Sequence, residues 1–170
     1  MREVILAENA GFCFGVQRAV EKSIDVRKQY GKKVYTLGPL IHNSDVVRYL
    51  EENDIYSIDD ADLNKLVEGD VIIIRSHGVP KDVIEKLKAK GLEVINATCP
   101  FVTKIQKTAE EYSKDGYNIV ILGDKNHPEV IGRNGWCDNR ARITPNGEFD
   151  TKVSGKVCAV SQTTEKEANW

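Results

Sequence analysis

The sequence predicts an α/β fold in which parallel strands alternate with helices. Short apolar runs alternate along almost the whole chain with stretches whose apolar residues recur at helical spacing. Residues 71–74, Val-Ile-Ile-Ile, are apolar at every position, as in a strand buried on both faces of a sheet. Strands that alternate with helices form parallel βαβ units, so we expect parallel sheets flanked by helices.

The expected strands are short and evenly distributed. They cover residues 3–7, 33–37, 55–58, 70–75, 92–95, 118–122 and 156–161. In parallel sheets, ligands gather at the carboxyl ends of the strands, where the loops that lead into helices converge. Residues that follow these strands are therefore the first candidates for a functional site.

The expected helices have recognisable start and stop signals. They cover residues 15–30, a segment capped by Asn43 or Ser44, residues 80–90 and residues 100–115. Pro80 suits a first helical position, and Gly91 suits a C-terminal stop. A last helix is expected from Glu165, with Thr163 or Thr164 as its cap. Residues 138–155 are rich in turn residues and predict no helix.

Two similar lobes are expected, residues 1–97 and residues 98–170, each with a parallel sheet flanked by helices. The second lobe is expected to be incomplete at its C-terminal end. The chain stops at Trp170, barely two turns into the last predicted helix, and so short a helix is marginal without packing.

Composition excludes some classes of function. The chain has 170 residues, of which 41% are hydrophobic and 29% charged, as in ordinary soluble domains. A net charge of −2 gives no overall positive field for nucleic acid or an anionic membrane, although a local basic pocket stays compatible with it. No apolar run approaches a membrane span, and no signal peptide is evident, so we expect a cytoplasmic location.

The four cysteines fall into two groups. Cys13 and Cys99 each precede a predicted helix, where backbone N–H groups and the helix dipole favour the thiolate that binds metals. Cys137 lies in a turn-rich segment and Cys158 in a strand, so structural roles suit them better. Disulfides are not expected, because the chain is not a short cysteine-dense secreted domain.

All three histidines, His42, His77 and His127, lie just beyond predicted strands. With Cys13 and Cys99 they place five ligand-type side chains at loops that can share one sheet edge. The histidines could bind a metal or donate hydrogen bonds to phosphate. A zinc site of two cysteines and two histidines and a nucleophilic cysteine–histidine pair stay open. Glu129 adds a carboxyl group to the loop of His127, or is simply a solvated residue at a helix start.

Six motifs occur in the order and at the intervals found in one enzyme family. They are Gly11–Val16, His42–Asn43, Ser76–Val79, Ala97–Pro100, His127–Val130 and Ser161–Thr164. From about residue 3 to the last residue, the chain resembles the 4-hydroxy-3-methylbut-2-enyl diphosphate reductases, the LytB/IspH family. Asn96 departs from the aspartate that some members have before the Ala-Thr-Cys-Pro motif.

The resemblance implies a three-lobed α/β enzyme that holds a [4Fe–4S] cluster. It implies reductive removal of the allylic hydroxyl from a diphosphate substrate, which yields isopentenyl and dimethylallyl diphosphates. By this resemblance, Cys13 and Cys99 match two of the three cluster ligands, and His42, His77 and His127 match donors to the diphosphate. Glu129 matches the proton source, and Thr163 matches the residue that organises the substrate hydroxyl.

The resemblance also implies partners and missing parts. Electrons would come from a ferredoxin- or flavodoxin-type donor. The third cluster cysteine and a Ser-x-Asn motif would lie in a third lobe beyond Trp170. We therefore expect the cluster to be absent or unstable in this chain, and the chain alone to be inactive. The alternatives are a non-catalytic diphosphate-binding domain and a zinc-binding structural domain.

Overall fold

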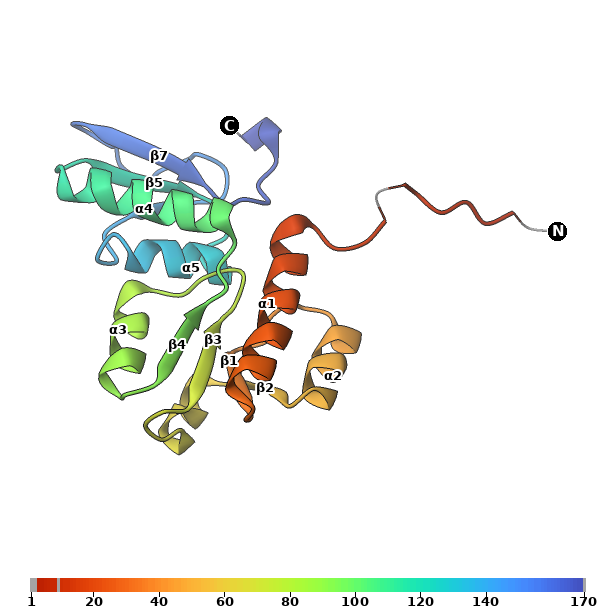
Figure 1. Cartoon of the computed structure of the whole chain (residues 1–170). Coiled ribbons are helices and arrows are strands. Elements are labelled where there is room, and N and C mark those ends of the chain that lie inside the picture. The colour runs from red at the N-terminus through yellow and green to blue at the C-terminus, as the bar shows by residue number, and fades with distance from the viewer. Residues whose placement is uncertain (1–2, 9, 170) are drawn as a thin grey trace.

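In a computed structural model, the chain forms two parallel sheets with helices packed against them (Figure 1). The structure describes residues 3–8 and 10–169. The predicted α/β class, with two parallel sheets flanked by helices, is confirmed. Within the described residues, no helix combines the length and apolar character that a bilayer crossing needs.

The first sheet has the strand order β2-β1-β3-β4, and every neighbouring pair is parallel. Its strands are β1 (Val34–Leu37), β2 (Ile55–Ile58), β3 (Val71–Ile74) and β4 (Glu93–Asn96). All four residues of β3 have no exposed surface. The continuous apolar run that predicted a strand buried on both faces is explained by this central position.

Helices cover both faces of the first sheet. On one face, α1 (Phe14–Tyr30) and α2 (Ser44–Glu52) pack against Val71 and Ile73. On the other, α3 (Lys81–Ala89) and the 3₁₀ helix η1 (Asp60–Lys65) pack against the alternate residues of β3. Asn43 caps α2, because its side-chain oxygen accepts hydrogen bonds from two backbone N–H groups of the first turn.

The second sheet is smaller, with the order β6-β5-β7, and it is also parallel. Its strands are β5 (Asn118–Leu122), β6 (Arg142–Thr144) and β7 (Val157–Ser161). Two helices share one core with this sheet, α4 (Pro100–Lys114) and α5 (Pro128–Gly135). Cys137, at the end of α5, is fully buried in that core.

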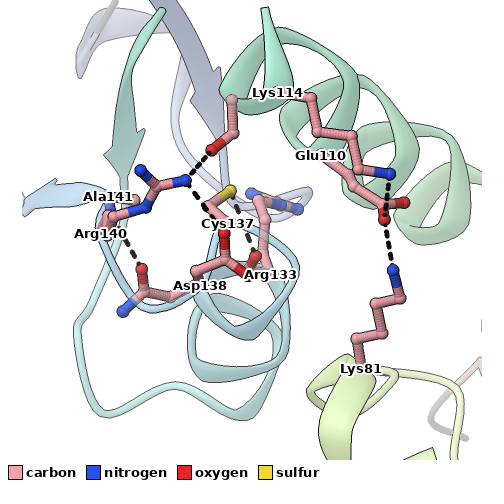
Figure 2. Close-up of polar contacts among 10 residues, drawn as sticks. Lys81, Glu110, Lys114, Arg133, Cys137, Asp138, Arg140 and Ala141 are labelled. Atoms are coloured by element: carbon pink, nitrogen blue, oxygen red, sulfur yellow. Dashed lines mark hydrogen bonds and ion pairs between the residues drawn. The ribbon is translucent and has the colours of Figure 1, made fainter. Parts of the chain in front are cut away.

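Polar contacts link the two lobes, and one of them, between α3 and α4, is drawn in Figure 2. Lys81 of α3 forms an ion pair with Glu110 of α4 at 2.7 Å, and Glu110 also pairs with Lys114 at 2.8 Å. The indole nitrogen of Trp136 donates a hydrogen bond to the backbone carbonyl of Val79 at 3.1 Å. These contacts keep the carboxyl edges of the two sheets close to each other.

Two predicted elements are wrong. Residues 3–7 form no strand but run away from both sheets as an extended segment (Figure 1), with Val4 91% and Leu6 83% exposed. A strand needs a neighbour for its backbone groups, and neither described sheet supplies one here. The helix from Glu165 is replaced by a single 3₁₀ turn, Glu167–Asn169, while Trp170 lies outside the described residues.

The other predicted elements begin and end within one or two residues of the prediction. Three elements of the structure have bounds that the sequence did not predict. These are η1, α5 and β6. Each is short, and the last two lie between polar, turn-rich residues. The division into lobes at residues 97 and 98 stays a prediction.

Candidate functional site

A hollow of about 180 Å³ collects most of the predicted site residues. It lies at the starts of α1 and α4, beside the start of α5. Six of the residues that line it are Cys13, His77, Cys99, His127, Glu129 and Thr163. We call this hollow the site pocket. His42 does not line it but lies next to His77.

Cys13 and Cys99 occupy equivalent positions, because they are the N-cap residues of α1 and α4. Free backbone N–H groups of a first helical turn favour a thiolate at such a position. Gly15, in the first turn of α1, lies against the second thiol: a Cβ atom there would come within 2.7 Å of Cys99 Sγ. The absence of a side chain at Gly15 therefore lets Cys99 approach the helix that begins after Cys13.

The other two cysteines have a different environment. Cys137 is fully buried, and its thiol donates a hydrogen bond to the carbonyl of Arg133 at 3.6 Å. Burial raises the pKa of the Cys137 thiol to about 11, and burial also raises the pKa of Cys158. Both side chains pack in the core of the second lobe. They are held as uncharged thiols, as the structural roles predicted for them require.

The three histidines, predicted to share a sheet edge, come together between the lobes. The ring of His77 lies 5.5 Å from that of His42 and 5.7 Å from that of His127, centre to centre. Nδ1 of His127 accepts a hydrogen bond from the backbone N–H of Glu129 at 3.2 Å. Since that nitrogen is an acceptor, the proton of a neutral ring is on Nε2, which is then a donor.

His77 is the central and most perturbed of the three. Burial lowers its pKa to about 4, helped by the nearby charge of Arg75. Its Nδ1 is buried and has no hydrogen-bond partner within the part of the chain that the structure describes. A neutral ring with an unused nitrogen beside two other imidazoles is a strong potential partner for a phosphate group.

Glu129 is almost completely buried, at 2% exposure, and both of its carboxylate oxygens accept hydrogen bonds. Its Oε1 accepts from Arg133 and from the backbone N–H of Thr163, the latter at 2.8 Å. Its Oε2 accepts from the hydroxyl of Thr163 at 2.7 Å. Glu129 is therefore not a solvated residue at a helix start, and it fixes Thr163 at the wall of the site pocket.

Arg133 is a site residue that sequence reasoning missed. It has no exposed surface, and it donates hydrogen bonds to Glu129 and to the carbonyl of Ser161. The available signal was its position four residues after Glu129, because such residues face each other on a helix. An arginine is ordinarily assigned to a solvated face, and only the fold shows that this face is the interior.

Comparison with known proteins gives the family. A sequence model described as LytB protein matches residues 4–170. The chain belongs to the LytB family. It is 59% identical to the 4-hydroxy-3-methylbut-2-enyl diphosphate reductase of Clostridium perfringens strain SM101, a match that covers 99% of this chain and 60% of the relative. The reductase of Clostridium acetobutylicum is 58% identical, and the match covers 27% of its length.

Solved structures agree with this family membership. A structure described as (E)-4-hydroxy-3-methyl-but-2-enyl diphosphate reductase, the terminal enzyme of the non-mevalonate pathway, superposes with a TM-score of 0.82 at 40% identity. The match covers 60% of the length of that structure and 99% of this chain. The reductase from Plasmodium falciparum gives 0.85 at 31% identity, with 52% of its length covered. This LytB chain thus spans about 60% of the length of the Clostridium perfringens relative and of the first of these solved structures.

The lowered pKa of His77 predicts a loss of stability in acid. The unfolded chain protonates this residue near pH 6.5 and the folded chain only near pH 4, so stability falls as pH drops through that interval. After a discount for partial exposure, we expect His77 to account for about 1–2 kcal/mol of that fall. Urea unfolding at a series of pH values should show that the free energy of unfolding falls less with pH in His77→Gln than in the unchanged protein. An equal fall in both proteins would contradict the assignment, and His42→Gln serves as the control.

The buried pair of Glu129 and Arg133 predicts a non-additive effect on stability. Glu129→Ala leaves the charge of Arg133 buried without its carboxylate, which should lower the free energy of unfolding by about 3–5 kcal/mol. The double change Glu129→Ala with Arg133→Met should recover a large part of that loss, because no buried charge is left. Urea unfolding of the three proteins measures both effects. Additive losses would show that the two side chains are not coupled.

Proposed function

We propose that this chain is the cluster- and diphosphate-binding part of a 4-hydroxy-3-methylbut-2-enyl diphosphate reductase. The reaction removes the allylic hydroxyl of the substrate as water, with two electrons and two protons taken up. The products would be isopentenyl and dimethylallyl diphosphates. The observation that carries this proposal is the site pocket, which is lined by two cysteines at helix N-cap positions, two histidines and a buried glutamate.

The histidines would bind the diphosphate. His77 and His127 line the pocket and His42 adjoins them, so three rings from three loops surround one place. His127 can donate its Nε2–H to a phosphate oxygen, and His77 lines the same pocket. A diphosphate would favour the charged form of His77, which would compensate for the burial that keeps this ring neutral in the free protein.

Cys13 and Cys99 would hold a [4Fe–4S] cluster together with a third thiolate from outside the described residues. Their chemistry fits, because both are thiols at helix starts and Gly15 leaves space for Cys99 against α1. When bound, such a cluster supplies electrons one at a time. The electron donor would be a ferredoxin- or flavodoxin-type protein.

Glu129 and Thr163 would move the proton. The hydroxyl of Thr163 donates to Glu129 Oε2, so a proton on one of these oxygens can pass to the other along an existing hydrogen bond. Arg133 and the backbone N–H of Thr163 hold the other carboxyl oxygen, so only Oε2 is available for this exchange. Low exposure of Glu129 keeps bulk water away from the exchange.

The proposal predicts that Glu129→Gln abolishes turnover in the full-length protein while substrate binding is retained. The amide oxygen can still accept from Arg133 and Thr163, so the shape survives, but the amide cannot supply a proton. We expect a fall in kcat of at least about a hundredfold. Turnover driven by dithionite and methyl viologen, with substrate affinity measured in parallel, checks this result.

The matched control is Glu111→Gln, which removes an exposed carboxylate on α4 outside the site pocket. It should leave turnover unchanged. Turnover by Glu129→Gln at the rate of the unchanged protein would remove Glu129 from the chemistry. That result would favour the alternative interpretation, a diphosphate-binding domain that is not catalytic.

The 170-residue chain by itself is predicted to be colourless after anaerobic incubation with iron and sulfide. Two thiolates leave part of a four-iron cluster without protein ligands, so the cluster should be lost on desalting. Absorbance near ~400 nm after desalting, compared with that of the full-length protein, tests this. A stable brown chain would contradict the prediction. Stoichiometric zinc that is lost in Cys13→Ser would instead favour a zinc site.

A further inference from the structure

A second hollow lies between α1 and α4, beside the loop that carries Cys99. Its volume is about 480 Å³, and it shares no lining residue with the site pocket. Thr98 and Pro100, the two chain neighbours of Cys99, are part of its wall. Three cations line it, Arg18, Lys104 and Lys107. We call this hollow the basic groove.

The charge of the basic groove is not compensated locally. No acidic residue lines it; its other walls are proline and neutral polar side chains. In the part of the chain that the structure describes, no ion pair involves Arg18, Lys104 or Lys107. The whole chain carries a net charge of −2. A concentrated positive surface on an acidic protein attracts and orients a negatively charged partner.

The basic groove is rigidly linked to the Cys99 loop. Arg18 donates a hydrogen bond to the carbonyl of Thr98 at 3.3 Å, and Lys22 donates to the carbonyl of Asn96 at 2.8 Å. The side-chain oxygen of Asn96 accepts from the backbone N–H of Thr98 at 2.9 Å. Arg18, one of the three groove cations, therefore also holds the loop that ends at Cys99.

We propose that the basic groove docks an acidic electron-carrier protein of the ferredoxin type. The inference rests on the proposed function, since Cys99 would be a ligand of the cluster that receives the electrons. Each reduced carrier would give one electron and leave oxidised, and two such events would match the two electrons of the reaction. The docked carrier would lie against Thr98 and Pro100, directly beside the thiolate of Cys99.

A protein partner fits the groove better than a small anion. The groove is more than twice as large as the site pocket, and two of its cations, Lys104 and Lys107, stand exposed on α4. Short-lived electron-transfer complexes bury small areas and depend on complementary charge, so that the carrier can bind and leave quickly. Exposed lysines around an open surface meet that requirement.

Asn96 offers a sensitive test because it lines the groove. Its amide is uncharged, so the groove has no carboxylate at this position. Asn96→Asp is isosteric and keeps the oxygen that accepts from Thr98. It therefore changes the charge of the groove and leaves the loop in place.

Binding is tested first, with the full-length protein and an oxidised acidic [2Fe–2S] ferredoxin as the probe. Calorimetric titration should show an affinity that falls steeply between low and physiological salt. Lys104→Gln with Lys107→Gln should weaken binding about tenfold at low salt, and Asn96→Asp should weaken it about threefold. Lys88→Gln with Lys152→Gln, which changes net charge equally outside the groove, should bind as the unchanged protein does.

Turnover separates this inference from the proposed function. With ferredoxin as reductant, the Lys104→Gln and Lys107→Gln double variant should have a kcat/KM about tenfold lower, with most of the change in KM for ferredoxin. With dithionite and methyl viologen, its rate should equal that of the unchanged protein. Absence of turnover with both reductants would refute the proposed function. The binding titration alone would then show whether the groove binds ferredoxin.

Two results would overturn the docking proposal. One is an equal loss of affinity for ferredoxin in the groove variant and in the Lys88 and Lys152 control, which would mean that only net charge matters. The other concerns inorganic diphosphate: it would bind tightly to the groove of the unchanged protein and displace ferredoxin from it, and it would do neither in the groove variant. That result would make the groove a small-anion site.

Discussion

Parallel strand pairing is the constraint on which the rest of this structure depends. In each sheet the first strand in the chain lies between the second and the third, and in the first sheet β4 adds a further strand beside β3. The loops after β1 and β3 therefore leave toward opposite faces of the first sheet, and those after β5 and β7 leave neighbouring strands of the second, so that each pair frames a crevice at its sheet edge. The crevice of the first sheet receives His42 and His77, and that of the second receives His127 and Thr163.

The two crevices form one site because the lobes face each other. The ion pair between Lys81 and Glu110 and the hydrogen bond of Trp136 connect the lobes away from the site pocket, so the histidine loops meet across the junction. The starts of α1 and α4 reach the same junction and bring Cys13 and Cys99 (Figure 1). Strand ends thus supply groups that suit an anion, and helix starts supply thiols that suit iron.

Sequence reasoning reached the parts of this arrangement that local signals determine. Apolar runs and the glycines and prolines around them located most strands and helices, and the position of His42, His77 and His127 just beyond predicted strands made their convergence predictable. Residues 3–7 were assigned wrongly, since a strand exists only with a partner that no local signal reveals. The burial of Arg133 and the meeting of Arg18 with Lys104 were also beyond reach, because both depend on how elements distant in sequence pack.

The buried and the surface charges of this chain differ in how they are compensated, and the difference indicates their roles. Arg133 is buried, and Glu129 and a backbone carbonyl compensate its charge, so neither side chain can move without leaving the other unpaired. That restraint keeps Glu129 Oε2 directed at the hydroxyl of Thr163. The cations of the basic groove form no ion pair among the described residues, and Lys104 and Lys107 face solvent, where uncompensated charge costs little. A fixed pair suits chemistry on a bound substrate, whereas free surface charge suits a partner that must bind and leave.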